Sequence, residues 1–120
     1  MPLKSDAFLL KDDRLFCNSR YVRTDVSKDE DVEALVTLTV ERFGGVDVMF
    51  ANAGILGGLG KTGDYPRETW DRVIAVNLGG VFNCMKYACL AMEASGTGGC
   101  IISTASTTGL RGFGSHPACV

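Results

Sequence analysis

The chain has 120 residues, a formal net charge of -2 and a hydrophobic content of 46%. A chain of this length forms at most one ordinary domain, and its composition supplies enough apolar side chains for a buried core. Its Lys and Arg residues form no cluster, which argues against nucleic acid or an anionic membrane surface as a partner. Its five cysteines form no Cys-x-x-Cys pair, so we expect neither disulfides nor a metal site. Reduced cysteines fit a cytoplasmic location, which we also expect.

Residues 1–19 carry the least interpretable pattern. The apolar run Ala7–Leu10 could form a strand, but it is too short for a signal peptide core or a membrane span. The next segment, Arg20–Thr24, alternates in the manner of a strand and ends at Asp25-Val26-Ser27. Asp followed closely by Ser is ordinary turn chemistry, so the residues alone favour a turn at Asp25.

A helix is predicted to begin at Ser27. Ser27 and Glu30 have the spacing of a capping box, and Gly44-Gly45 is a typical end signal. The apolar side chains of this stretch fall at helical spacing on one face: Val32, Leu35, Val36, Val40 and Phe43. The helix therefore serves as a crossover that leads to the next strand.

Val46–Phe50 is an apolar run rich in β-favouring residues, and it leads directly into Asn52, Ala53 and Gly54. These features predict a buried parallel strand. In open α/β sheets, ligands bind beyond the carboxyl ends of the strands. The Asn52–Gly54 turn therefore marks a candidate ligand site.

The loop Gly54–Thr62 ends in Gly-Lys-Thr and invites comparison with a phosphate-binding P-loop. The spacing is wrong, because Ile55 stands where the first glycine of that motif is required. Gly63–Pro66 also does not begin a helix of the kind that binds phosphate. We expect a flexible loop over the ligand crevice instead. Nucleotide hydrolysis at Gly60-Lys61-Thr62 is kept only as a third hypothesis, after the two main ones given at the end of the sequence analysis.

A long helix is predicted to start at Pro66, with an apolar stripe that contains one asparagine, Asn77. A buried amide needs hydrogen-bond partners, so Asn77 is either a structural bridge or a site residue. Gly79-Gly80 is costly in mid-helix and suggests that another backbone or a ligand passes close by. The stripe comprises Trp70, Val73, Ile74, Val81, Met85, Ala88 and Met92.

Cys100–Ser103 is predicted to be a second short buried strand, after a turn at Ser95–Gly99. Hydroxyl side chains crowd its carboxyl end, and such rows are most often loop caps. They include Ser106. His116 stands beside Ser115 and Pro117 and is interpreted as a loop residue rather than a base.

Four motifs occur in the order and rough spacing of one known family: Asp25-Val26, Asn52-Ala53-Gly54, Val76-Asn77 and Ser103–Ser106. From about Arg20 to Gly112 the chain resembles the short-chain dehydrogenase/reductase family. The resemblance implies an α/β fold, an incomplete doubly wound (Rossmann-like) parallel sheet with flanking helices. It also implies that residues 1–120 form a single partial NAD(P)-binding domain, and that the cofactor is NAD or NADP.

The resemblance also implies roles for individual residues. Asp25 would hydrogen-bond the adenine amino group and Val26 would contact the ring. Asn52, Ala53 and Gly54 would also contact the cofactor. Asn77 would position a water in a proton relay, and Ser106 would hydrogen-bond the substrate carbonyl or hydroxyl.

The chain departs from the family pattern at two motifs, the glycine-rich turn and Tyr-x-x-x-Lys. The glycine-rich TGxxxGxG turn is absent, the catalytic tyrosine position falls on Cys119, and the lysine of Tyr-x-x-x-Lys would fall beyond Val120. A thiol, with a pKa of about 8.5, does not simply replace a phenol. In the doubly wound strand order, Arg20–Thr24 and Val46–Phe50 are not neighbours, so the chain either pairs its strands differently or folds incompletely alone.

Two main hypotheses follow. The chain is the middle of an NAD(P)-dependent enzyme that moves hydride between nicotinamide and a carbonyl/alcohol substrate in its full-length form, and is inactive alone. Alternatively, it is a truncated, non-catalytic isoform that associates with a full-length relative through the 70–92 helix, which forms much of a dimer interface in the family. Core packing is nevertheless the commoner explanation for Phe82 and Tyr87 on that helix.

Overall fold

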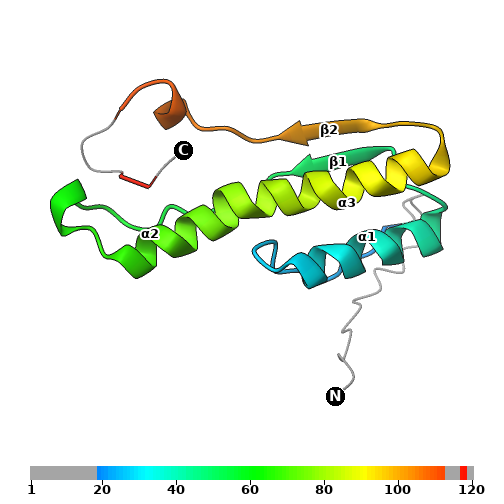
Figure 1. The fold of residues 1–120 in the computed structure, drawn as a ribbon, viewed down its shortest axis with the longest axis horizontal. Helices are drawn as coiled ribbons and strands as arrows, with labels where there is room; N and C mark the ends of the chain where they lie inside the picture. Colours follow the sequence, from blue (N-terminus) through cyan, green and yellow to red (C-terminus); the bar gives the residue numbers. More distant parts are fainter. Residues whose placement is uncertain (1–18, 113–116, 119–120) are drawn as a thin grey trace, which may run out of the picture.

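The computed structural model describes residues 19–112 and 117–118 (Figure 1). The predicted strand at Ala7–Leu10, His116 and Cys119 lie outside the described residues. Two short 3-10 turns occupy Thr62–Asp64 and Thr107–Gly109. The main elements, in chain order, are α1 (Asp29–Phe43), β1 (Val48–Ala51), α2 (Arg67–Ile74), a π-helical turn (Ala75–Gly79), α3 (Gly80–Ser95) and β2 (Cys100–Ser103).

The two strands pair in parallel, with Val48 opposite Cys100 and Ala51 opposite Ser103. The Thr104 N–H donates to the Ala51 carbonyl at 3.2 Å and extends the pairing past the strand ends. Parallel pairing needs a long crossover, and the α2–α3 helix provides it. The predicted parallel strands are therefore confirmed, although the first begins and ends slightly later than predicted. The loops after both strands leave from the same edge of the sheet.

The prediction that both strands are buried is wrong for one face of the sheet. Met49 and Ile101 pack against the core, whereas Val48, Phe50 and Ile102 on the opposite face are exposed. Neighbouring residues on a strand point to opposite faces, and α1 and α3 cover the same face. No element of the described chain covers the other one. The core is made of Val32, Val36, Val46, Ala51, Cys84, Tyr87, Ala88 and Met92.

The predicted strand at Arg20–Thr24 is also wrong within the described structure. The segment is not part of a strand, and the ladder among the described residues joins only β1 and β2. It leads into a turn at Val26-Ser27 and then into α1.

α1 confirms the predicted helix but not its capping box. The residue before the helix is Lys28, which makes no side-chain cap, while the Ser27 hydroxyl donates to Asp25 Oδ1 at 2.7 Å. The Asp25 side chain therefore takes the hydroxyl that was predicted to cap the helix. The helix ends as predicted at Gly44, whose φ of 87° favours glycine.

The long helix begins after Pro66, as predicted, and runs through α2, the π turn and α3 (Figure 1). Tyr87 is only 8% exposed, which confirms core packing, but Phe82 is 65% exposed, so its predicted core position is wrong. α3 meets the core on one side only, and Phe82 lies on the other side. Trp70 and Met85, part of the predicted stripe, are also exposed.

The helical stretch Arg67–Ser95 is long and apolar enough to cross a membrane by length and composition, and 22% of its most apolar window is buried. The core helix of a soluble protein passes the same test. Here the buried residues of α3 pack on the sheet and on α1, which favours the core-helix explanation.

Candidate functional site

Asn77 lies in the π-helical turn and binds the loop that follows β1. Its Oδ1 accepts the Ile55 N–H at 2.8 Å, and its Nδ2 donates to the Ile55 carbonyl at 2.9 Å. One amide thus satisfies both backbone groups of a single residue, which requires a side chain with a donor and an acceptor. The structural-bridge interpretation of Asn77 is therefore correct, and its role toward a water stays a prediction. π turns inside α-helices frequently mark functional sites.

Asn52 joins the ends of the two strands. Its Oδ1 accepts a hydrogen bond from Thr104 Oγ1 at 2.6 Å, and both side chains are exposed. Ala53 and Gly54 are also exposed. A Cβ added at Gly54 would lie 3.5 Å from Asn77 Oδ1, an ordinary contact. Packing within the described chain therefore does not require glycine at this position.

The Asp25 turn is held by a dense set of hydrogen bonds. Asp25 Oδ1 accepts the Ser27 hydroxyl at 2.7 Å and the Ser27 N–H at 3.1 Å. The Asp25 N–H donates to Asp31 Oδ2 at 3.0 Å, and its carbonyl accepts the Lys28 N–H at 3.0 Å. The bonds from Ser27 lower the pKa of the Asp25 carboxyl, which is exposed and ionised at neutral pH. The turn interpretation of Asp25 is confirmed, and its contact with adenine stays a prediction.

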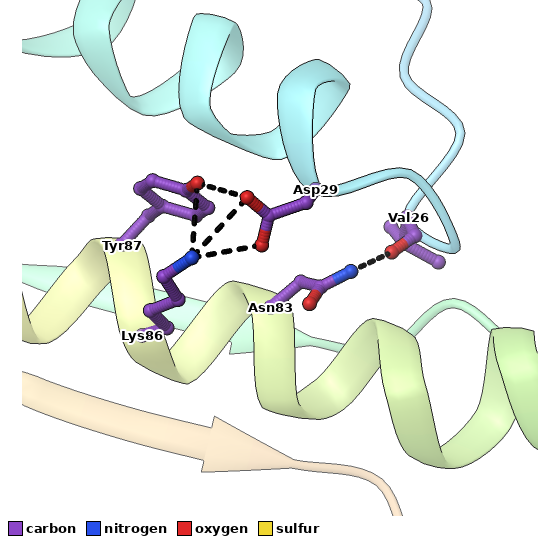
Figure 2. Close-up of polar contacts among 5 residues, drawn as sticks. All are labelled: Val26, Asp29, Asn83, Lys86 and Tyr87. Atoms are coloured by element: carbon purple, nitrogen blue, oxygen red, sulfur yellow. Dashed lines mark hydrogen bonds and ion pairs between the residues drawn. The ribbon is translucent and has the colours of Figure 1, made fainter.

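Val26 packs directly on α3. Asn83 Nδ2 donates to the Val26 carbonyl at 3.0 Å (Figure 2), and a Cβ added at Gly80 would lie 2.5 Å from Val26 Cγ2. The prediction that another segment passes close to the glycine pair is thus confirmed for Gly80. The atom nearest to a Cβ on Gly79 is the Ile74 carbonyl oxygen at 3.8 Å, so packing does not explain that glycine.

Asn83 was not among the site residues predicted from the sequence. The available signal was a second helical amide that follows Gly80 by a turn of helix. Its partner lies 57 residues earlier in the chain, which no local pattern indicates.

A polar cluster of Asp29, Lys86 and Tyr87 ties the start of α1 to α3 (Figure 2). Lys86 Nζ lies 3.0 Å from Asp29 Oδ1 and 3.2 Å from the Tyr87 hydroxyl, which itself donates to the Asp29 carboxylate. The bond from Tyr87, followed by that from Lys86, lowers the pKa of Asp29. The same contact with Asp29 raises the pKa of Tyr87 and of Lys86. Tyr87 is therefore unsuited to replace a catalytic tyrosine, whose pKa must be lowered.

Ser106 caps the short 3-10 turn after β2. Its Oγ accepts the Thr108 hydroxyl at 2.6 Å and the Thr108 N–H at 3.3 Å. The loop-cap interpretation of Ser106 is therefore correct. No hydrogen bond within residues 19–112 joins Ser106 to Asn77 or Asn52. Cys119, at the expected tyrosine position, is outside the described residues.

The glycine-rich loop packs on α2. The Tyr65 hydroxyl donates to the Gly57 carbonyl at 2.9 Å, and Gly57 has a φ of 72°. Lys61-Thr62 runs into a 3-10 turn, not into the α-helix N-terminus that a P-loop needs. A pocket of about 460 Å³ lies between this loop and α2, lined by Ile55, Gly57, Gly58, Glu68, Thr69, Arg72 and Val73. Within the described part of the chain, no three metal-ligating side chains converge.

The structure thus brings two of the predicted cofactor segments onto one stretch of helix. Asn77 holds the residue after Asn52–Gly54, and Gly80 and Asn83 hold Val26. These contacts lie within two turns of helix at the carboxyl side of the sheet. Ser106 stands on the neighbouring loop, after β2.

Comparisons with known proteins agree with this arrangement. The short chain dehydrogenase family matches residues 14–118. The chain is 41% identical over 96 residues to Short-chain dehydrogenase reductase 3c of Arabidopsis thaliana, which covers 80% of this chain and 37% of that protein. It is 42% identical over 92 residues to levodione reductase of Leifsonia aquatica, which covers 77% of this chain and 34% of that protein.

Solved structures give the same result. NAD+-bound xylitol dehydrogenase superposes with a TM-score of 0.76 and 35% identity, over 82% of this chain and 37% of that one. Levodione reductase superposes with a TM-score of 0.75 and 40% identity, over 79% of this chain and 36% of that one. The predicted fold class, a partial Rossmann-like parallel sheet with flanking helices, is confirmed. The chain spans between a third and two fifths of the length of these relatives.

Proposed function

This chain belongs to the short-chain dehydrogenase family, and we propose that it supplies the cofactor-binding edge of an NAD(P)-dependent oxidoreductase. In its full-length form, such an enzyme would move hydride between nicotinamide and a small alcohol or carbonyl substrate. The observation that carries the proposal is the anchoring of Asp25-Val26 and Asn52–Gly54 on the same two helical turns.

The residues present fit the adenine end of such a cofactor. Asp25 offers an ionised, exposed carboxylate in a structured turn, and Val26 offers an apolar neighbour. Gly54 lies at the open edge of the sheet, where contacts within the described chain do not account for a glycine. The glycine-rich phosphate turn of the family does not occur in this sequence. The bound dinucleotide supplies the hydride chemistry.

Ser106 and Asn77 are proposed to act toward the substrate and toward a proton-relay water. The Ser106 oxygen accepts two hydrogen bonds from Thr108, so its own proton is left to donate to a substrate oxygen. Asn77 uses one N–H and one lone pair on Ile55 and keeps one of each for a water. Because the tyrosine position falls on Cys119, we propose that this chain alone does not catalyse hydride transfer.

Thermal unfolding of the 120-residue chain, followed by circular dichroism with and without NADH or NADPH, tests cofactor binding. A ligand that binds only the folded state raises the melting midpoint by mass action. We expect a cooperative transition that one of the two nucleotides shifts upward, and a smaller shift for Asp25→Ala. Asp64→Ala, at an exposed acid in a distant turn, is the control. A cooperative transition that neither nucleotide shifts would refute the proposal.

A second candidate function is association with a full-length relative through the 70–92 helix. The supporting observation is an exposed apolar stripe at helical spacing on the side of the helix away from the core, formed by Leu78, Phe82 and Met85. We expect a heterodimer by size-exclusion chromatography that Phe82→Lys abolishes. Ala94→Lys, which adds the same single charge at an exposed position near the end of α3 and off this stripe, is the control. No association of the unsubstituted chain would refute this candidate.

A further inference from the structure

The turn proposed to recognise adenine is held from α3 and not from a neighbouring strand. Arg20–Thr24, which leads into it, has no ladder partner among the described residues. Instead Asn83 Nδ2 donates to the Val26 carbonyl at 3.0 Å, across 57 residues of sequence (Figure 2). A side chain of a distant helix therefore helps to fix the position of the turn, in addition to the hydrogen bonds within the turn itself.

One peptide group links the hydrogen bond from Asn83 to the Asp25 carboxylate. The carbonyl of Val26 and the N–H of Ser27 belong to the same planar peptide unit. Asn83 holds the carbonyl side of that unit, and the N–H side donates to Asp25 Oδ1 at 3.1 Å. Because the unit is rigid, fixing its carbonyl also fixes the direction of the N–H, and with it the carboxylate.

Close packing removes the remaining freedom of the turn. A Cβ on Gly80 would lie 2.5 Å from Val26 Cγ2 and 3.4 Å from the Val26 carbonyl oxygen, so Val26 sits directly on the helix. Beyond the turn, Lys86 and Tyr87 bind Asp29 at the first position of α1. The turn itself is thus attached to α3 at Val26, whereas the contact at Asp29 holds the start of α1 and does not involve the Val26–Ser27 peptide.

We propose that Asn83 is a positioning residue for adenine recognition, acting through the Val26–Ser27 peptide on Asp25. The inference rests on the proposed function, because it assigns to Asn83 the orientation of the turn that contacts the cofactor. Asn83 itself does not touch the adenine. Its loss misorients the carboxylate and weakens discrimination between bases, beyond any effect on stability.

The test compares two ligands on the 120-residue chain: the dinucleotide that shifts the melt, NADH or NADPH, and its hypoxanthine analogue. The analogue carries an oxygen in place of the adenine amino group. The unsubstituted chain is expected to bind the adenine form about three- to tenfold more tightly, as one hydrogen bond allows. In Asn83→Leu, which has similar size but no donor, we expect this ratio to fall close to one.

The ratio of the two affinities separates positioning from stability, because a loss of stability alone weakens the binding of both dinucleotides equally. Lys86→Met is the matched control: it removes a contact between α1 and α3 one turn away and leaves the Val26 bond in place. We expect its ratio to equal that of the unsubstituted chain. If Asn83→Leu gives no cooperative melt, Asn83→Asp, with an acceptor in place of the donor, serves for the same measurement.

Each outcome decides the inference. A lowered ratio in the Asn83 variant with an unchanged ratio in Lys86→Met supports it. An unchanged ratio in a folded Asn83 variant overturns it and leaves the proposed function intact. If the unsubstituted chain binds neither dinucleotide, the proposed function fails and the inference falls with it.

Discussion

At the level of single residues, two adjacent glycines in the long helix occupy different surroundings. A Cβ at Gly80 would lie 2.5 Å from Val26 Cγ2, whereas the nearest atom to one at Gly79 lies 3.8 Å away. Glycine inside a helix costs about 1 kcal/mol relative to alanine. Alanine therefore stabilises the helix wherever there is room for its methyl group. Substitution by alanine should change the free energy of unfolding in opposite directions at the two positions.

Gly79→Ala is expected to raise the free energy of unfolding by about 0.5–1 kcal/mol, because it removes the helical cost of glycine. Gly80→Ala is expected to lower it by about 1–3 kcal/mol, because the new methyl group overpacks against Val26. Urea unfolding of both variants measures the difference, and each variant is the control for the other. An increase at both positions would show that Val26 moves aside without cost.

The two hydrogen bonds between Asn77 and Ile55 should contribute measurably to stability. Asn77→Leu removes both hydrogen bonds to Ile55 and leaves two part-buried backbone groups without that partner. We expect the free energy of unfolding to fall by about 2 kcal/mol. Asn52→Ala, which loses a single exposed bond to Thr104, is the control and should cost about 0.5 kcal/mol. Equal losses would mean that the Asn77 bridge contributes nothing beyond an exposed contact.

At the level of elements, the cluster of Asp29, Lys86 and Tyr87 makes the attachment of α1 to α3 depend on pH. The pKa of Asp29 is lowered below 3.8, so the contribution of its carboxylate is present above that value and is lost as pH falls through the folded pKa. The pKa values of Tyr87 and Lys86 are raised above 10.0 and 10.5, so their contributions are lost as pH rises past those values.

The melting midpoint of the chain is therefore expected to fall at both ends of the range from about pH 3 to pH 11, and Asp29→Asn should flatten both ends. Asp71→Asn is the control, because Asp71 pairs with Arg67 one turn away in an exposed 2.7 Å ion pair within α2. The alkaline end is the sharper test. If Asp29→Asn leaves the alkaline fall unchanged, Lys86 and Tyr87 do not act through Asp29.

The sequence predicted the elements more successfully than their surroundings. α1, the long helix and both strands follow from local periodicity and end signals, which act over a few residues. Burial depends on what lies opposite, so Phe82 and the outer sheet face were placed in the core wrongly. The predicted strand at Arg20–Thr24 was wrong, because a strand needs a neighbouring strand to pair with, and the local sequence pattern does not show whether one is present.

The candidate site shows the same division. The motifs identified the positions of Asp25, Asn52 and Asn77, because each stands just after a strand-like run or within a helical stripe. Their distant contacts were not predictable. Ile55 meets Asn77 across 22 residues of sequence, Thr104 meets Asn52 across 52, and Asn83 meets Val26, the neighbour of Asp25, across 57. Even the capping box failed for a local reason: Asp25 took the hydroxyl of Ser27.

At the level of the whole molecule, the chain is a single layer of helices on one face of a two-stranded sheet. The sheet presents its other face without cover from any described element, and the exposed residues there are Val48, Phe50, Cys100 and Ile102. Adjacent strands bring these side chains together, since Val48 pairs with Cys100 and Phe50 with Ile102. Such a contiguous apolar patch favours association with another surface.

We therefore expect the 120-residue chain to self-associate through this sheet face, and the double variant Val48→Thr, Ile102→Thr to reduce that association. Threonine keeps the β-branched shape that suits a strand while making the face more polar. Because both positions are exposed, the melting midpoint should change little. Met49→Thr, on the face packed against the core, is the matched control and should instead lower the free energy of unfolding by about 2 kcal/mol. Light scattering over a concentration series measures the association; equal scattering by the double variant and the unsubstituted chain would show that another surface, such as the Phe82 side of α3, drives it.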